Sequence, residues 1–331
     1  MAKVGSRTDD TALRGCLEGI VADRFGSGAS IAGIRRARFP HLGSYDCDSV
    51  TVELEDGERL ALFLKDFGFS RLSKDDRELR RVRELCVYRD LLAQADLGTP
   101  RYYGSLWDES QARFWLILER VEGAVVEHVD VERGVPAAAW LARLQGHFLR
   151  LGDRLGACDF LIRHDARFFR SKAESARRDV DRLSPASSRR LAGLLDRYDR
   201  VVDRMLGQPQ SLVHGGYIPW HILLDAGREP ARVCAVDWEL AALGSTLYDL
   251  AIFTDGVESP VREPIEQAYR DAAAQHHVPV PARPEMQRVM DCFRLHRILD
   301  WLSRSVEKQF SERKVAGLVA QAERTGDRAL D

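Results

Sequence analysis

The sequence lacks the patterns that mark secreted, zinc-stabilised or membrane-spanning proteins. Its six cysteines are scattered, and no two of them form a Cys-x-x-Cys pair. This spacing disfavours zinc and redox sites and favours free thiols in a reducing compartment. Residues 1–10 are polar and lack the apolar core of a signal peptide. No apolar run reaches the roughly 18 residues that a membrane span needs, so we expect a cytoplasmic protein without a membrane partner.

Three common catalytic signatures are also missing. There is no phosphate-binding P-loop anywhere and no Gly-rich G-x-G-x-x-G motif near residues 35–50. No Gly-x-Ser-x-Gly elbow supports a serine hydrolase. An excess of one charge is lacking too, because 49 Lys and Arg balance 51 Asp and Glu to a net charge of −2. This balance gives no reason to expect a nucleic-acid partner.

The chain has 331 residues, of which 45% are apolar, so it is long enough for two lobes or domains. The first part is β-rich. Val50–Leu54 alternates, residues 56–57 (Asp-Gly) mark a hairpin turn, and Leu60–Leu64 reads as a buried strand. A helical pattern over 73–95 and a strand over 114–118 follow. This order predicts a small sheet with one helix packed on it.

After Gly123 the pattern becomes helical. We predict helices over 137–149, 191–206, 260–274 and 286–306, a hairpin over 221–237, and a polar tail from Ala320 that frays. The chain is therefore predicted to be α+β, with a β-rich domain over 1–122 and a mostly helical domain over 123–331.

The motifs that are most typical of a catalytic site lie between Leu212 and Leu250. They are His214-Gly215-Gly216, His221, Asp237-Trp238-Glu239 and Tyr248-Asp249-Leu250. Their order and spacing resemble the catalytic half of the aminoglycoside phosphotransferase and choline kinase families. The resemblance implies a two-lobe protein-kinase-like fold, with an antiparallel β-sheet N-lobe, a larger helical C-lobe and a nucleotide cleft between them. It further implies ATP or GTP and Mg²⁺ as cofactors and a small molecule as substrate.

The catalytic loop departs from the family pattern at two positions. The resemblance implies that His214 braces the loop, that Asp237 binds the metal and that Asp249 braces the same region. Gly216 stands where the family has its catalytic Asp, and it cannot act as a base. His221 stands where the family has a metal-binding Asn. Imidazole ligates zinc, copper or nickel better than Mg²⁺, so we expect a weakened Mg²⁺ site made by Asp237 and His221.

The resemblance also assigns the nucleotide-binding residues. Lys65 ends an apolar strand and Glu84 lies on the next helix. In kinase-like folds such a Lys holds the phosphates and such a Glu orients it, although both are also explained as surface charges. Residues 118–123 resemble the hinge, so Glu119 and Val121 are candidates for the base-binding backbone. An ordinary linker has the same pattern. Ser44, in Leu42-Gly43-Ser44-Tyr45, offers donors to a phosphate, and a plain turn explains it equally.

Three functions therefore stay open. The first is a small-molecule kinase that works without its usual base, with its acceptor region in residues 150–210 and 255–305. The second is an inactive, pseudokinase-like protein that binds or sequesters a natural product. In that case Tyr217, Pro219 and Trp220 would fill the space of the metal–phosphate complex. The third is an enzyme of different chemistry that uses His221 as acid or base.

Overall fold

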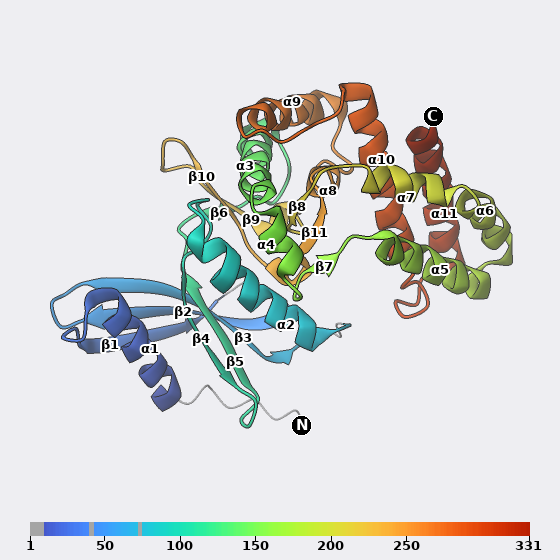
Figure 1. Cartoon of the computed structure of the whole chain (residues 1–331). Coiled ribbons are helices and arrows are strands. Elements are labelled where there is room, and N and C mark those ends of the chain that lie inside the picture. Colours follow the sequence, from blue (N-terminus) through green and yellow to red (C-terminus); the bar gives the residue numbers. More distant parts are fainter. Residues whose placement is uncertain (1–9, 40–42, 72–74) are drawn as a thin grey trace. The chain divides into compact units, whose positions relative to one another are not determined.

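The computed structural model describes residues 10–39, 43–71 and 75–331 of the chain (Figure 1). Residues 1–9 and Leu42, at the start of the candidate phosphate loop, lie outside this described part. The chain divides into two compact units, Met1–Gly123 and Ala124–Asp331. The first contains an antiparallel β-sheet and the second is mostly helical, so the predicted α+β class is confirmed.

The sheet of the first unit has five strands in the order β1-β2-β3-β5-β4, and all neighbours are antiparallel. The strands are β1 (Ile31–Arg38), β2 (Tyr45–Leu54), β3 (Arg59–Ser70), β4 (Tyr102–Asp108) and β5 (Arg113–Glu119). Alternate residues of β2, namely Val50, Val52 and Leu54, are buried in one cluster with Leu13 and Leu17 of helix α1 (Asp10–Phe25). The alternation that predicted the strand thus buries one face of the sheet against α1, because successive strand side chains point to opposite faces.

Helix α2 (Arg77–Cys86) continues through a π-helical turn, Val87–Leu91, into a short 3₁₀ turn, Leu92–Gln94. The Arg81 guanidinium lies 3.6 Å from the centre of the Phe114 ring, which belongs to β5. A cation over an aromatic face is attracted by the ring quadrupole. This contact ties α2 to the sheet and helps to place the buried face of α2 against the strands.

The second unit consists mainly of helices and two short three-stranded sheets (Figure 1). The helices are α3 (Val131–Leu149), α4 (Gly152–Ala157), α5 (Ala166–Leu183), α6 (Pro185–Leu195), α7 (Tyr198–Leu206), α8 (Tyr248–Phe253), α9 (Ser259–Gln275), α10 (Arg283–Leu302) and α11 (Glu312–Leu330). The sheets are β10-β9-β6 and β7-β11-β8. Their strands are β6 (Ala124–Val125), β7 (Ile162–Arg163), β8 (Gln210–Val213), β9 (Ile222–Asp225), β10 (Arg232–Ala235) and β11 (Ala242–Ser245). Within the described ranges, no helix has the length and apolar character to cross a membrane.

The hairpin of β9 and β10 brings together two sequence positions that are 16 residues apart. The strands are antiparallel, and Ala235 at the end of β10 pairs with Ile222 at the start of β9. His221 directly precedes β9, and Asp237 follows β10 by two residues. Because the start of one antiparallel strand meets the end of its partner, the hairpin places these two residues at the same end of the sheet.

Two helical predictions need correction. The predicted helix over 191–206 is broken between α6 and α7, at residues 196–197. The predicted fraying tail is instead the second half of helix α11, whose Val315, Val319 and Ala322 are buried. The tail is polar on average, but its few apolar residues recur at helical spacing and form one buried stripe, which packing stabilises more than mean hydropathy suggests.

Candidate active site

In the first unit, Lys65 and Glu84 form a buried ion pair. Lys65 lies on β3 and Glu84 on α2, and their exposed fractions are 7% and 1%. The Lys65 Nζ donates to both carboxylate oxygens of Glu84, at 2.8 and 2.7 Å. Its ammonium group also lies 5.4 and 5.3 Å from the ring centres of Tyr45 and Phe67. The pairing expected from the sequence is therefore present, and it fixes one cation in a defined position.

The other nucleotide-binding candidates of the first unit lie at strand ends. Glu119 ends β5, and its side chain accepts a hydrogen bond of 3.1 Å from the backbone N–H of Arg101. Val121 follows in an irregular segment, and its backbone has no hydrogen-bond partner among the described residues. Ser44 directly precedes β2, and its carbonyl accepts from the Arg71 N–H at 2.8 Å. The backbone N–H and C=O groups of Val121 thus remain available for hydrogen bonds, and Ser44 lies at the start of a strand.

In the second unit, Asp249 and His214 hold the loop that follows β8. The Asp249 carboxylate, at the start of α8, accepts from the backbone N–H groups of His214 at 2.6 Å and Gly215 at 3.0 Å. Burial raises the pKa of Asp249 to about 7, although these two N–H donors act in the opposite direction. The bracing expected of Asp249 is therefore confirmed by its contacts.

The contacts of His214 define its tautomer. Its Nδ1 accepts from the N–H of Gly216 at 3.3 Å, so its Nε2 carries the proton and donates to the carbonyl of Val236 at 2.9 Å. Burial, together with the nearby His221, lowers the pKa of His214 to about 3. The ring also packs 4.5 Å from the Trp238 ring. A neutral, fully buried imidazole with both nitrogens engaged is a structural support, so we infer that His214 braces the loop and does not transfer protons.

His221 and Asp237 face each other across the hairpin end. The His221 Nδ1 lies 2.8 Å from the carbonyl oxygen of Gly216, which can only accept, so Nδ1 is the donor. The Nε2 atom then points toward Asp237 Oδ2 at 3.4 Å. The Nε2 lone pair and the Asp237 carboxylate oxygen are both potential metal ligands at this separation. Asp237 itself has a left-handed backbone, with φ of 68°, which is uncommon for a residue other than glycine.

This pair fits a divalent metal ion, and its donor types identify which kinds. His221 Nε2 and Asp237 Oδ2 lie 3.4 Å apart, close enough that both residues would hold the same ion. Mg²⁺ prefers oxygen ligands only, whereas imidazole is a good ligand for transition metals. The His221–Asp237 pair therefore fits a transition-metal ion better than Mg²⁺, whereas Asp237 and Glu239, whose carboxylate oxygens lie within 4.8 Å of each other, provide the oxygen ligands that Mg²⁺ favours.

The bulky residues of the loop do not fill a common space. Tyr217 is fully buried, its hydroxyl donates to the Ala137 carbonyl at 2.9 Å, and its ring stacks on Trp140. It thus anchors the loop to helix α3. Trp220, in contrast, is 60% exposed. Of Tyr217, Pro219 and Trp220, the last two line an open pocket. The expectation that these three residues together fill a metal–phosphate site is therefore wrong for Tyr217.

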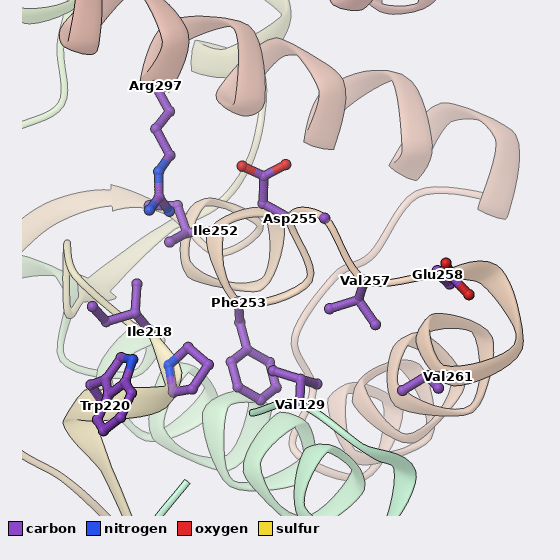
Figure 2. Close-up of a pocket in the computed structure, with 12 residues that line it drawn as sticks. Val129, Ile218, Trp220, Ile252, Phe253, Asp255, Val257, Glu258, Val261 and Arg297 are labelled. Carbon is purple, nitrogen blue, oxygen red and sulfur yellow. The ribbon is translucent and has the colours of Figure 1, made fainter. Parts of the chain in front are cut away.

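The pocket beside the loop has a volume of about 560 Å³ and lies entirely within the second unit (Figure 2). Its walls come from the loop, from α8 and the turn after it, from the start of α9 and from Arg297 of α10. The sequence had placed the acceptor region partly here, in 255–305, but nothing in it singled out Arg297. Arginines of the other predicted acceptor region, residues 150–210, have partners outside this pocket. Arg163 donates to the carbonyls of Gly156 and Cys158, and Arg170 pairs with Asp199.

The sheet-plus-helix architecture, the strand Lys paired with a helix Glu, and the braced loop followed by Asp237 define a protein-kinase-like fold. The chain belongs to the phosphotransferase enzyme family (APH), whose family model matches residues 44–289. Family and fold together place the chain in the class of phosphotransferase enzymes with a protein-kinase-like fold. A comparison with curated protein sequences gives no significant match.

Solved structures confirm the fold at low sequence identity. One is choline kinase from Cryptosporidium parvum Iowa II, with 12% identity and a TM-score of 0.61, covering 98% of this chain and 97% of that one. Another is macrolide 2'-phosphotransferase from Brachybacterium faecium, with 18% identity and a TM-score of 0.57, covering 92% and 97%. A third is the GDP complex of a mutant aminoglycoside 2'-phosphotransferase-IIIa, with 12% identity and a TM-score of 0.58, covering 95% and 97%.

Proposed function

We propose that this protein transfers the γ-phosphoryl group of ATP or GTP to a hydroxyl group of a small molecule. In this reaction the acceptor oxygen forms a bond to the γ-phosphorus, the bond to the β–γ bridging oxygen breaks, and the nucleoside diphosphate and a proton are released. The observation that carries the proposal is the buried Lys65–Glu84 pair. A buried cation held by one carboxylate costs desolvation, and binding to nucleotide phosphates explains why it is maintained there.

The remaining residues receive roles by the same reasoning. Lys65 would bind phosphate oxygens, Glu84 would orient Lys65, and the free backbone edge of Val121 would pair with the nucleotide base. Asp237 and His221 would hold the divalent ion that the phosphates also bind; when bound, this ion neutralises phosphate charge. The GDP complex of the structural neighbour supports the use of a nucleotide. The neighbours named for choline and for macrolides differ in acceptor, so neither name is transferred to this chain.

Gly216 leaves the proposed reaction without a base at the usual position. General-base catalysis contributes about 10²–10⁴-fold, whereas phosphoryl transfer depends mainly on positioning and electrostatics. A kinase without this base is therefore slow but active. The same observation supports a second candidate, a binding protein with no turnover, in which the same residues only hold a ligand.

A nucleotide titration followed by thermal unfolding tests the proposal. Wild-type protein is measured with ATP and with GTP, each with Mg²⁺, with Mn²⁺ or with EDTA. Saturation at about 100 times Kd stabilises the folded state by about 2.7 kcal/mol. The shift should require metal and should vanish in Asp237→Ala. Asp225→Ala is the control, because Asp225 is a carboxylate of the same hairpin that pairs with Arg228 instead.

A further variant tests the metal assignment. His221→Asn replaces the imidazole with an amide oxygen, so it should move the preference from Mn²⁺ toward Mg²⁺ at unchanged nucleotide specificity. The absence of any nucleotide shift at millimolar concentration would end the kinase proposal. A metal-dependent shift with no phosphate transfer to any acceptor would favour the binding protein.

A further inference from the structure

The pocket of the second unit has an apolar wall and a charged edge (Figure 2). Its apolar wall consists of Val129, Ile218, Pro219, Trp220, Ile252, Phe253, Val257 and Val261. A volume of about 560 Å³ lies within the range of roughly 300–1,000 Å³ that is typical of sites for drug-sized ligands. An exposed Trp at the edge of such a wall offers one large apolar face to a ligand. The pocket therefore suits a compact molecule that has both an apolar part and a polar or charged part.

The position of the pocket connects it to the proposed reaction. Ile218 is two residues after Gly216 and Trp220 is one residue before His221, and both side chains line the pocket. Consecutive Cα atoms are about 3.8 Å apart, so the pocket wall lies within about 8 Å of position 216 and within about 4 Å of position 221 along the backbone. A molecule in this pocket lies next to the loop at which a hydroxyl would receive phosphate.

Arg297 gives the pocket its chemical selectivity. It extends from α10 toward Ile252 in the close-up, and it is partly buried (Figure 2). Across the described parts of the chain, its guanidinium has no hydrogen-bond or ion-pair partner. Neighbouring arginines of the same helix are paired: Arg294 binds Asp291 and Arg288 binds Glu285. A partly buried charge without a partner is unfavourable, and a planar guanidinium matches a carboxylate with two parallel hydrogen bonds.

Two acidic residues also line the pocket, and they would favour a cationic ligand instead of an anionic one. Asp255 and Glu258 are both exposed, and Figure 2 shows the carboxylate of Asp255 directed toward α10 and away from the apolar wall. Exposed charges are screened by water and salt, whereas a partly buried charge is screened much less. Arg297 therefore has the stronger influence on a ligand that sits against the apolar wall.

We propose that this pocket binds the phosphate acceptor, and that the acceptor is an apolar alcohol or phenol carrying a carboxylate that pairs with Arg297. The acceptor role rests on the proposed phosphotransferase function. The preference for an apolar anion does not, because it depends only on the pocket itself.

Two fluorescent probes test the charge preference without nucleotide. 8-Anilinonaphthalene-1-sulfonate is an apolar anion, and N-phenyl-1-naphthylamine is the same ring system without the sulfonate. Arg297→Gln should weaken binding of the anionic probe about tenfold or more, as expected for loss of a charged hydrogen bond. Binding of the neutral probe should stay within about twofold of wild type, which also shows that the pocket is still folded. Trp220→Ala should weaken both probes.

The control is Arg288→Gln, since Arg288 lies on the same helix and is similarly exposed but does not line the pocket. It should change neither affinity. In a competition arm, 3-(4-hydroxyphenyl)propionate should displace the anionic probe at a lower concentration than tyramine, which has a phenol ring with a cationic chain.

The proposal is overturned if Arg297→Gln leaves the anionic affinity unchanged, if tyramine competes better, or if neither probe binds saturably. Stronger competition by tyramine would mean that Asp255 and Glu258 control the pocket. The nucleotide titration is a separate readout. If it fails while the probe results hold, the pocket remains a site for an apolar anion and only the acceptor role is lost.

Discussion

Two neighbouring glycines of the catalytic loop lie in different surroundings, and this difference predicts opposite outcomes for one substitution. Gly215 has a φ of 79°, and a Cβ atom on it would lie 2.1 Å from the backbone carbonyl oxygen of Leu240. A Cβ atom on Gly216 would lie 3.6 Å from a methyl group of Leu240 and 3.7 Å from Nδ1 of His221, which are ordinary contacts. Only position 216 can therefore carry a side chain without a shift of the backbone.

The magnitudes follow from these contacts. In Gly215→Ala the left-handed backbone costs about 1–2 kcal/mol and the overlap with Leu240 costs about 1–3 kcal/mol. The sum of about 2–5 kcal/mol lowers Tm by about 4–20 °C at roughly 2–4 °C per kcal/mol. Gly216→Ala should change stability by less than about 1 kcal/mol. Thermal unfolding of both variants measures the contrast, and equal stability of the two would contradict the reasoning.

The same position tests the missing base. Gly216→Asp places a carboxylate where the family has its catalytic Asp, so phosphate release from ATP or GTP should rise by about 10²–10⁴-fold. Gly216→Asn is the matched control, because it has nearly the same volume and no basic group. Nucleotide affinity is measured alongside the rate. A rate for the Asp variant no higher than that of the Asn variant, at equal nucleotide affinity, would show that this loop position does not act on the reaction.

Three further predictions concern stability. Lys65→Met should destabilise the first unit by about 3–5 kcal/mol because it removes the ammonium group that pairs with the buried carboxylate of Glu84; denaturant unfolding should show that adding Glu84→Leu recovers part of this loss. Burial lowers the pKa of His296 to about 4. The unfolded chain therefore takes up a proton near pH 6.5 that the folded chain does not, and stability falls as pH drops through this value, by about 2 kcal/mol between pH 7 and 5. His296→Gln should remove this part of the pH dependence, whereas substitution of the exposed His128 should not. Tyr217→Phe should cost about 0.5–1.5 kcal/mol, since it removes the hydrogen bond from the Tyr217 hydroxyl to the Ala137 carbonyl of α3; an unchanged midpoint in urea would show that this hydrogen bond does not contribute to stability.

The pairing of Lys65 with Glu84 was predicted from the resemblance to kinase-like folds, since residue type alone explains both equally well as surface charges. The hairpin that brings His221 to Asp237 was predictable because its two strands are patterned and consecutive along the chain. The helical C-terminus was not, because its polar composition hides a stripe of apolar residues that is stable only when packed.

The pocket at Arg297 could not be predicted either. Arg297 looks like any other arginine of a charged helix, and its lack of a partner is visible only once α8, α9 and the loop surround it. The same holds for Tyr217, which the sequence placed near the site and the structure places in the core.

The sequence by itself determined the fold class, the order of the functional residues and the loss of a carboxylate at position 216. All three follow from residue type and spacing, which can be read from the local periodicity and from the family resemblance. Only the tertiary structure decided that Gly216 has room for a side chain while Gly215 has none, which nitrogen of His221 faces Asp237, and that Arg297 borders an apolar pocket. Each of these depends on contacts between segments distant in the chain, and such contacts form only when the whole unit packs.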